Sequence, residues 1–345
     1  MAEIKRHWLH NPWQEIFLIM APAILPVFLV IAFSDYFQSH EVSTGWWILL
    51  VLCVDVGHVY STLFRLYWDP KSYSAYGKLL IAIPVTGFAA GFALHLYEPA
   101  FFWRILAYFA AFHFVRQQYG FMRLYSRHEQ KLKWSRLIDA LAIYNATLYP
   151  LLYWHVHATG KLAWFIKGDF VNLHLNEVFP FITYLYWAIV IVYAAKEIYL
   201  SWRDINVPKN LIVFGTYLSW YVGIVFYQTD LIFTLLNVVA HGIPYMALIW
   251  LYGKKKKPSN FSFNVKGLAI FAAVLLSLAY VEEFMWDGFV WNDHPEIFPS
   301  FVSTVSPQHS MLLSGIVALL VLPQLTHYVL DGFIWRFSKD SQARL

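Results

Sequence analysis

The chain has 345 residues, of which 59% are hydrophobic and only 13% are charged. Soluble domains carry about 25% charged residues, so this composition excludes a soluble enzyme, a disordered chain and a disulfide scaffold. The net charge of +4 forms no domain-sized basic face, which excludes nucleic acid as a partner. The single cysteine, Cys53, cannot form an internal disulfide bond.

The hydrophobic residues are gathered in ten stretches, each long enough to cross a lipid bilayer. A bilayer core of about 30 Å requires about 20 apolar residues in a helix. Such stretches occur near residues 14–33, 45–67, 78–98, 100–125, 137–157, 179–200, 209–228, 230–252, 266–286 and 311–334. The sequence therefore predicts an all-α fold, a polytopic membrane bundle of about ten transmembrane helices. Because no linker or repeat interrupts the pattern, residues 1–345 are expected to form a single integral-membrane domain.

The positions of the lysines and arginines predict the orientation of the bundle. With a cytoplasmic N-terminus, ten spans place 22 of the 25 lysines and arginines on the cytoplasmic side. This asymmetry is the positive-inside pattern of membrane proteins. We therefore expect both termini and loops 119–136 and 253–265 in the cytoplasm, and loop 287–309 outside. The short loops favour the inner (cell) membrane of a bacterium.

Histidines lie inside the predicted spans, where an ionisable residue is costly and is a functional candidate by default. At least four of the fourteen histidines lie well inside a span, away from its ends: His58, His113, His241 and His327. All four are on even-numbered predicted spans, and at about 1.5 Å per residue their depths agree within about 8 Å. The sequence therefore predicts one layer of four imidazoles that bind a metal ion.

Each of these histidines has a polar residue three or four positions away, on the same face of its helix. The pairs are Asp55 with His58, His113 with Gln117, Asn237 with His241, and His327 with Asp331. Metal-bound histidines usually give their second ring nitrogen to a carboxylate or a carbonyl group. The four partner residues are expected to be either further metal ligands or hydrogen-bond partners of the ligands, and their spacing leaves both roles open.

The donor types narrow the choice of metal. Imidazole with carboxylate or carboxamide oxygen, and without thiolate, suits Fe(II), Zn(II), Mn(II) or Cu(II). Zinc would fit hydrolysis, whereas iron fits oxygen chemistry on an apolar substrate. Four protein ligands on an octahedral iron would also leave positions open. The sequence therefore favours a membrane oxygenase or oxidoreductase that uses Fe(II) and acts on a lipid-soluble substrate such as a carotenoid, an isoprenoid or a lipid.

The order and form of the histidine segments also carry a resemblance. One segment consists of His327, Asp331, Phe333, Ile334 and Arg336, and another of His113 and Phe114. With one histidine on each of four separate helices, the chain resembles the Brp/Blh family of bacteriorhodopsin-related membrane proteins. The resemblance implies cleavage of β-carotene to retinal at an iron centre. The chain departs from the pattern at Asn237, near His241, where the family leads us to expect a richer histidine cluster.

Two other functions stay open from the sequence. Buried acidic residues and histidines also form proton or metal relays in transporters, many of which have proline-broken helices. The prolines inside predicted spans are Pro84, Pro150, Pro244 and Pro323. Paired histidines at matched depth would also suit a haem-binding electron carrier.

Overall fold

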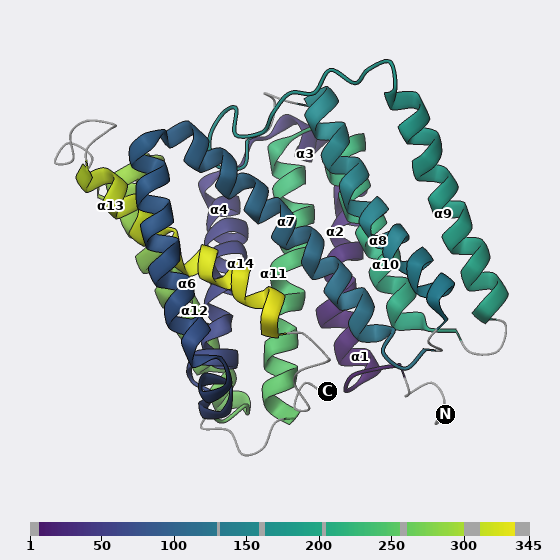
Figure 1. Ribbon diagram of the computed structural model, residues 1–345, viewed down its shortest axis with the longest axis horizontal. Helices are drawn as coiled ribbons and strands as arrows, with labels where there is room; N and C mark the ends of the chain where they lie inside the picture. Colours follow the sequence, from purple (N-terminus) through teal and green to yellow (C-terminus); the bar gives the residue numbers. More distant parts are fainter. Residues whose placement is uncertain are drawn as a thin grey trace. The chain divides into compact units, whose positions relative to one another are not determined.

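A computed structural model describes residues 7–129, 132–158, 163–201, 205–255, 261–299 and 311–334 of the chain (Figure 1). Within these ranges the backbone forms helices and connecting turns, and it forms no strand. The predicted all-α fold is therefore confirmed. The parts of the predicted loops at 130–131, 256–260 and 300–310 lie outside the described residues.

Several helices contain π-helical stretches, labelled η, in which i→i+5 hydrogen bonds widen the turn. In chain order the first elements are α1 (Pro12–Glu15), η2 (Ile16–Met20), α2 (Ala21–Ala32), α3 (Ser34–Ser39), α4 (Thr44–Trp47), η3 (Ile48–Val56), α5 (Gly57–Thr62), η4 (Leu63–Tyr67), α6 (Pro70–Tyr97) and α7 (Pro99–Tyr125). The remaining elements are α8 (Lys133–Tyr153), η5 (Trp154–Ala158), α9 (Phe179–Ser201), α10 (Val207–Trp220), η6 (Tyr221–Phe226), α11 (Asp230–Lys255), α12 (Val265–Trp286), η7 (Asp287–Trp291), α13 (Met311–Leu320) and α14 (Leu322–Ile334).

Seven of the described helical segments are long and apolar enough to cross a membrane, and a bent pair raises the number to eight. The seven are Pro12–Ala32, Thr44–Tyr67, Pro70–Tyr97, Phe179–Leu200, Val207–Phe226, Asp230–Lys255 and Val265–Trp291, and the bent pair is α13 with α14. These segments coincide with eight of the ten predicted spans. The helices are thus compatible with a membrane protein, while the count of ten and the orientation of the termini stay predictions.

The other two predicted spans, 100–125 and 137–157, form the long helices α7 and α8. Both are less apolar than the seven segments, because polar residues interrupt them. In α7 these include Arg104 and Arg116, and in α8 they include Asp139.

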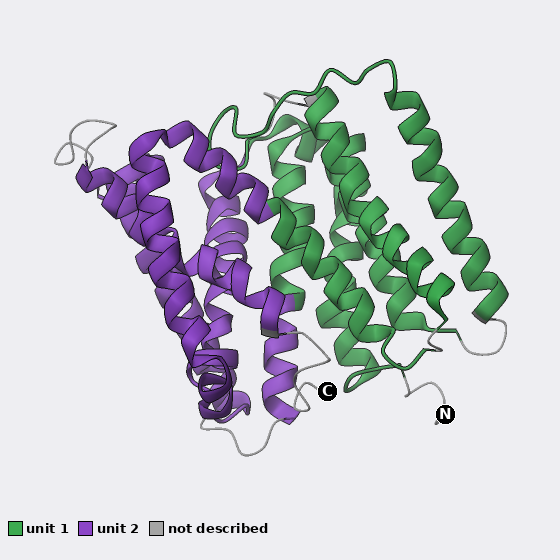
Figure 2. Cartoon of the chain, viewed as in Figure 1, with its two compact units in different colours: residues 1–41, 111–244 green, residues 42–110, 245–345 purple. Residues whose placement is uncertain are grey.

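The chain divides into two compact units (Figure 2). Unit 1 comprises residues 1–41 and 111–244, and unit 2 comprises residues 42–110 and 245–345. The chain passes from one unit to the other inside α7 and again inside α11, so each of these helices has a part in both units.

In unit 2, small residues on α6 allow the helix pair α13 and α14 to approach closely. A Cβ atom at Gly87 would lie 2.8 Å from Leu325 Cδ2, and one at Gly91 would lie 3.7 Å from Ala318 Cβ. Small residues four positions apart permit such contact between helices. The 43° bend between α13 and α14 occurs beside Pro323, which has no N–H to continue the helix. This packing positions α14, the helix that carries His327.

In unit 1, buried ion pairs join α8, α9 and α10. The Lys209 ammonium lies 2.6 Å from Glu197 and 2.8 Å from Glu129, and Lys196 pairs with Asp139. Both lysines are among the 22 basic residues expected on the cytoplasmic side, but their side chains are buried. A buried charge is tolerated only when it is paired, so this network fastens the three helices together.

Candidate metal centre

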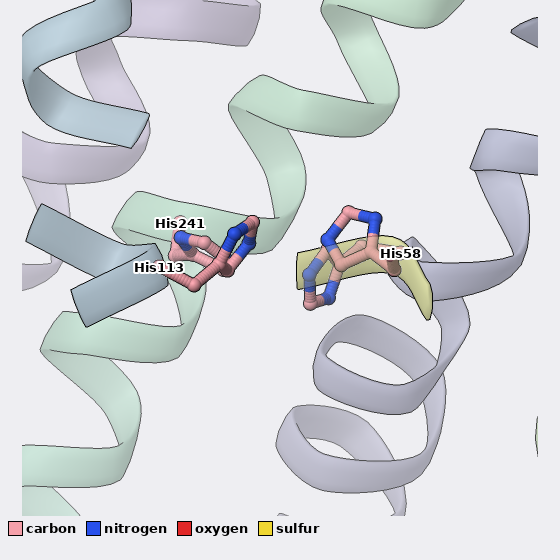
Figure 3. A group of neighbouring side chains, drawn as sticks. His58, His113 and His241 are labelled. Atoms are coloured by element: carbon pink, nitrogen blue, oxygen red, sulfur yellow. The ribbon is translucent and has the colours of Figure 1, made fainter. Parts of the chain in front are cut away.

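His113 and His241 are neighbours in unit 1, where α7 and α11 bring them together (Figure 3). Both are buried, and their rings meet edge to face with centroids 4.9 Å apart. Phe114, the residue after His113, stacks on His241 with a centroid distance of 3.6 Å and an angle of 7°. The stacked ring fixes the plane of the His241 imidazole.

Two glutamines hold the backbone of α11 at His241. Pro244 has no N–H, so it cannot donate to the carbonyl of Ala240 four positions before it. Gln118 Nε2 supplies a donor to that carbonyl at 3.5 Å, and Gln117 Nε2 donates to the carbonyl of His241 at 2.8 Å. The residue predicted as a partner of His113 thus contacts the backbone of the other histidine.

Two carboxamide oxygens near His241 have no hydrogen-bond partner among the described residues. They are Gln117 Oε1 and Asn237 Oδ1, and both are buried. The Asn237 amide nitrogen donates to the carbonyl of Phe233 at 3.0 Å, one turn earlier in α11. Buried acceptors are normally satisfied, so an unmatched pair is consistent with a ligand site beside this histidine.

His58 and His327 are neighbours in unit 2, on α5 and α14. Both are 1% exposed, and their rings meet edge to face with centroids 5.0 Å apart. The His58 Nδ1 atom lies 3.3 Å from the carbonyl oxygen of Val54. A carbonyl oxygen only accepts, so Nδ1 carries the proton and Nε2 carries the lone pair that a metal ligand needs.

A chain of hydrogen bonds fixes the second ring. The Tyr245 hydroxyl donates to Asp331 Oδ1 at 2.6 Å, because a carboxylate only accepts. The Thr62 hydroxyl, 3.2 Å away, must then donate to Tyr245, and it accepts from His327 Nδ1 at 2.8 Å. His327 therefore carries its proton on Nδ1 and its lone pair on Nε2, as His58 does.

Neither predicted aspartate makes a side-chain hydrogen bond to its histidine. Asp331 Oδ2 lies 4.0 Å from His327 Nε2, and Asp55 Oδ1 lies 3.9 Å from His58 Nδ1. Both distances exceed hydrogen-bond range. Asp55 is in the π-helical stretch η3, whose wide turn no longer stacks residues three apart, and its side chain is one-third exposed. Asp331 instead acts on its histidine through Tyr245 and Thr62.

The two pairs together form one group of four buried histidines that could hold a metal ion. One ring nitrogen from each of His58, His113, His241 and His327 lies within 4.8 Å of the others. In the described part of the chain, no carboxylate or thiolate belongs to this group. The structure thus brings together all four predicted ligands, and neither Asp55 nor Asp331 belongs to the group.

The sequence did not single out Thr62 and Gln118, and it placed Tyr245 only on the helix face of His241. Thr62 and Tyr245 each follow one of the histidines by four positions, so helical spacing places them on the right faces. Nothing in the spacing links either of them to His327. Pro244 was the one sequence feature that could have indicated a role for Gln118, because a proline leaves the carbonyl of Ala240, four positions earlier, without its helical donor.

No protein-family model, curated protein or solved structure matches this chain.

Proposed function

We propose that the chain is a membrane-embedded metalloenzyme that oxidises or cleaves a lipid-soluble substrate. The supporting observation is the group of four buried histidines with ring nitrogens within 4.8 Å of one another. Buried polar groups need partners, and four imidazoles gathered without a carboxylate among them match the donor set of a metal ion. The hydrogen bonds of His58 and His327 also support a metal site, because each leaves a lone pair on Nε2.

The metal that we propose is Fe(II). Four nitrogen donors fit iron as well as zinc, manganese or copper, and four ligands leave positions open on an octahedral ion. Bound iron would supply oxygen chemistry at this place. The protein residues hold the site: Val54 and Thr62 fix the tautomers of two ligands, and Phe114 fixes the plane of a third.

The surroundings of the unit 1 histidines favour an apolar substrate. Phe114 contacts the ring of Trp164 at 5.1 Å, and Trp164 contacts Phe233 at 5.7 Å. Trp154 adds a further contact to Phe233 at 4.9 Å. Such an aromatic wall next to His241 offers no charge and suits a carotenoid, an isoprenoid or a lipid. β-Carotene, the substrate that the Brp/Blh resemblance implies, is one such candidate.

The ring contacts disfavour haem between the two members of either pair. In both pairs the imidazoles meet edge to face at 4.9–5.0 Å, which is direct ring contact. A porphyrin would have to separate the rings of such a pair. A single metal ion needs no such separation.

The test is the metal content and visible spectrum of the purified protein and of four variants. We expect stoichiometric iron without a Soret band, and loss of metal in His58→Ala, His113→Ala, His241→Ala and His327→Ala. The controls are His128→Ala, which is exposed, and His95→Ala, which is buried against Ser314 outside the group. A Soret band would indicate haem, and absence of metal from the wild type would favour the transporter. Full metal occupancy in two or more of the four variants would contradict the ligand set.

A further inference from the structure

Unit 2 contains four carboxylates inside two of its apolar helical segments. Asp55 is in η3, Glu282 and Glu283 are at the end of α12, and Asp287 begins η7. Glu282, Glu283 and Asp287 are 5%, 8% and 2% exposed. Burying an ionised carboxylate is costly unless it is paired and hydrogen-bonded, so each needs a physical explanation.

Glu282 has such an explanation. Its Oε2 atom accepts a hydrogen bond from the Tyr60 hydroxyl at 2.6 Å. Its Oε1 atom accepts from Trp286 Nε1 and from Gln324 Nε2, both at 3.3 Å. Three donors from three elements therefore hold this carboxylate in place.

Glu283 and Asp287 have no comparable set of donors. Within the described ranges, the Glu283 side chain makes no hydrogen bond or ion pair with another residue, and the carboxylates of Glu282, Asp55 and Asp287 are the groups that act on it electrostatically. Asp287 Oδ1 accepts from the backbone N–H groups of Asp293 and His294, at 2.8 and 2.9 Å. Its Oδ2 atom is buried and has no partner in the described structure. Both side chains thus offer acceptor oxygens that a cation would satisfy.

These carboxylates also lead, by helical spacing and electrostatic influence, to a proposed metal ligand. Asp287 and Glu283 are four positions apart, on one face of the α12–η7 segment. Glu283 is within electrostatic range of Asp55, whose Oδ1 atom lies 3.9 Å from His58 Nδ1. The series starts near Trp291, where the apolar segment ends, and leads along unit 2 to His58.

We propose that Asp287, Glu283 and Asp55 are the route by which a divalent cation reaches His58. This inference rests on the metal centre of the proposed function. Carboxylate oxygens accept a hydrated divalent cation, and imidazole nitrogens bind first-row transition metals more selectively, so the ion passes from the oxygens to the histidines. The negative groups act by raising the local concentration of the cation and its rate of association.

The test is the rate at which metal-free protein takes up Co²⁺, followed by its visible absorption in a stopped-flow instrument. Glu283→Gln and Asp287→Asn should each slow the uptake, and the double variant should slow it by about 10-fold or more, in the range of electrostatic steering. Final occupancy and final spectrum should equal those of the wild type. Glu98→Gln, which changes an exposed carboxylate in the same unit, should leave the rate unchanged.

Both substitutions keep the shape of the side chain and remove only an unmatched charge, so the variants are expected to fold. Glu283→Asp, which keeps the charge, should load Co²⁺ at nearly the wild-type rate.

An unchanged rate in the double variant would overturn the route, because it would mean that these carboxyls hold protons rather than guide cations. Loss of final occupancy would also overturn it, because the carboxylates would then be ligands. A wild type that binds no Co²⁺ would instead refute the metal centre itself.

Discussion

Asp331 controls a histidine that it does not touch. Its carboxylate accepts from Tyr245, and the direction of that hydrogen bond sets the direction of the next two, through Thr62 to His327. An acceptor at one end of the chain therefore fixes the tautomer at the other end. This is the role that a carboxylate or a carbonyl group usually performs by direct contact with a metal-bound histidine.

The hydrogen-bond chain predicts partial losses of metal affinity. Thr62→Val removes the acceptor of His327 Nδ1, and Asp331→Asn weakens the acceptor at the end of the chain, so each should lower metal affinity by about 10–100-fold. The measurement is a metal titration of the purified variants. Thr86→Val is the matched control, because the Thr86 hydroxyl bonds only to carbonyls of its own helix. If Asp331→Asn abolished binding as fully as His327→Ala, Asp331 would be a ligand and the chain would not explain its role.

At the scale of the helices, the position of His241 depends on how the proline inside α11 is compensated. Pro244 leaves the Ala240 carbonyl without its helical donor, and Gln118 supplies a donor from α7. Gln118 is itself held by the Thr216 hydroxyl, which donates to its Oε1 atom at 3.0 Å. The break in one helix thus becomes the place where a second helix is attached.

This attachment predicts that two substitutions are coupled. Gln118→Leu leaves the buried carbonyl without a donor and should lower the free energy of unfolding by about 1–3 kcal/mol. Pro244→Ala restores an N–H for the same carbonyl. In a Pro244→Ala background, Gln118→Leu should therefore lower the free energy of unfolding by at least about 0.5 kcal/mol less than it does in the wild type. Denaturant unfolding of the detergent-solubilised protein measures both values, with Gln38→Leu on exposed α3 as the control. Equal costs in the two backgrounds would show that Gln118 does not serve this carbonyl.

At the scale of the whole molecule, the exposed helix faces are apolar while several charges are buried. On α9, Phe181, Tyr184 and Ile198 are each about 70% exposed, whereas Lys196 on the same helix is buried with Asp139. Exposed apolar surface of this extent is unusual for a protein in water, and a bilayer would cover it. The arrangement supports the predicted membrane location.

The orientation predicts which loops meet an impermeant thiol reagent. In a Cys53→Ala background, Glu296→Cys should react in intact cells, because loop 287–309 is expected outside. Trp134→Cys, in the first turn of α8 and within the segment 119–136 that is expected in the cytoplasm, should react only after the cells are permeabilised. Both positions are exposed, so access to the side chain is not limiting. Labelling of Trp134→Cys in intact cells would reverse the orientation.

The sequence by itself determined the helical fold, the positions of the apolar segments and the four histidines. Each of these follows from properties within about 20 consecutive residues, the length of one span. The same local reasoning selected Asp55, Asp331, Asn237 and Gln117, because helical spacing reports which residues share a face. It overestimated the contact between Asp55 and His58, since spacing does not reveal that η3 is π-helical.

Only the tertiary structure decided which residues serve which histidine. Thr62 and His327 are 265 positions apart, and Gln117 and His241 are 124 apart, so each contact depends on which helices are neighbours. The unmatched Asp287 oxygen and the carboxylates around Glu283 likewise became visible only once their surroundings were known. The hydrophobic periodicity of a helix specifies how much of it is apolar, but it does not specify the helix that covers it. The choice of partner is made by close packing at positions such as Gly87, where the absence of a Cβ admits one particular neighbour.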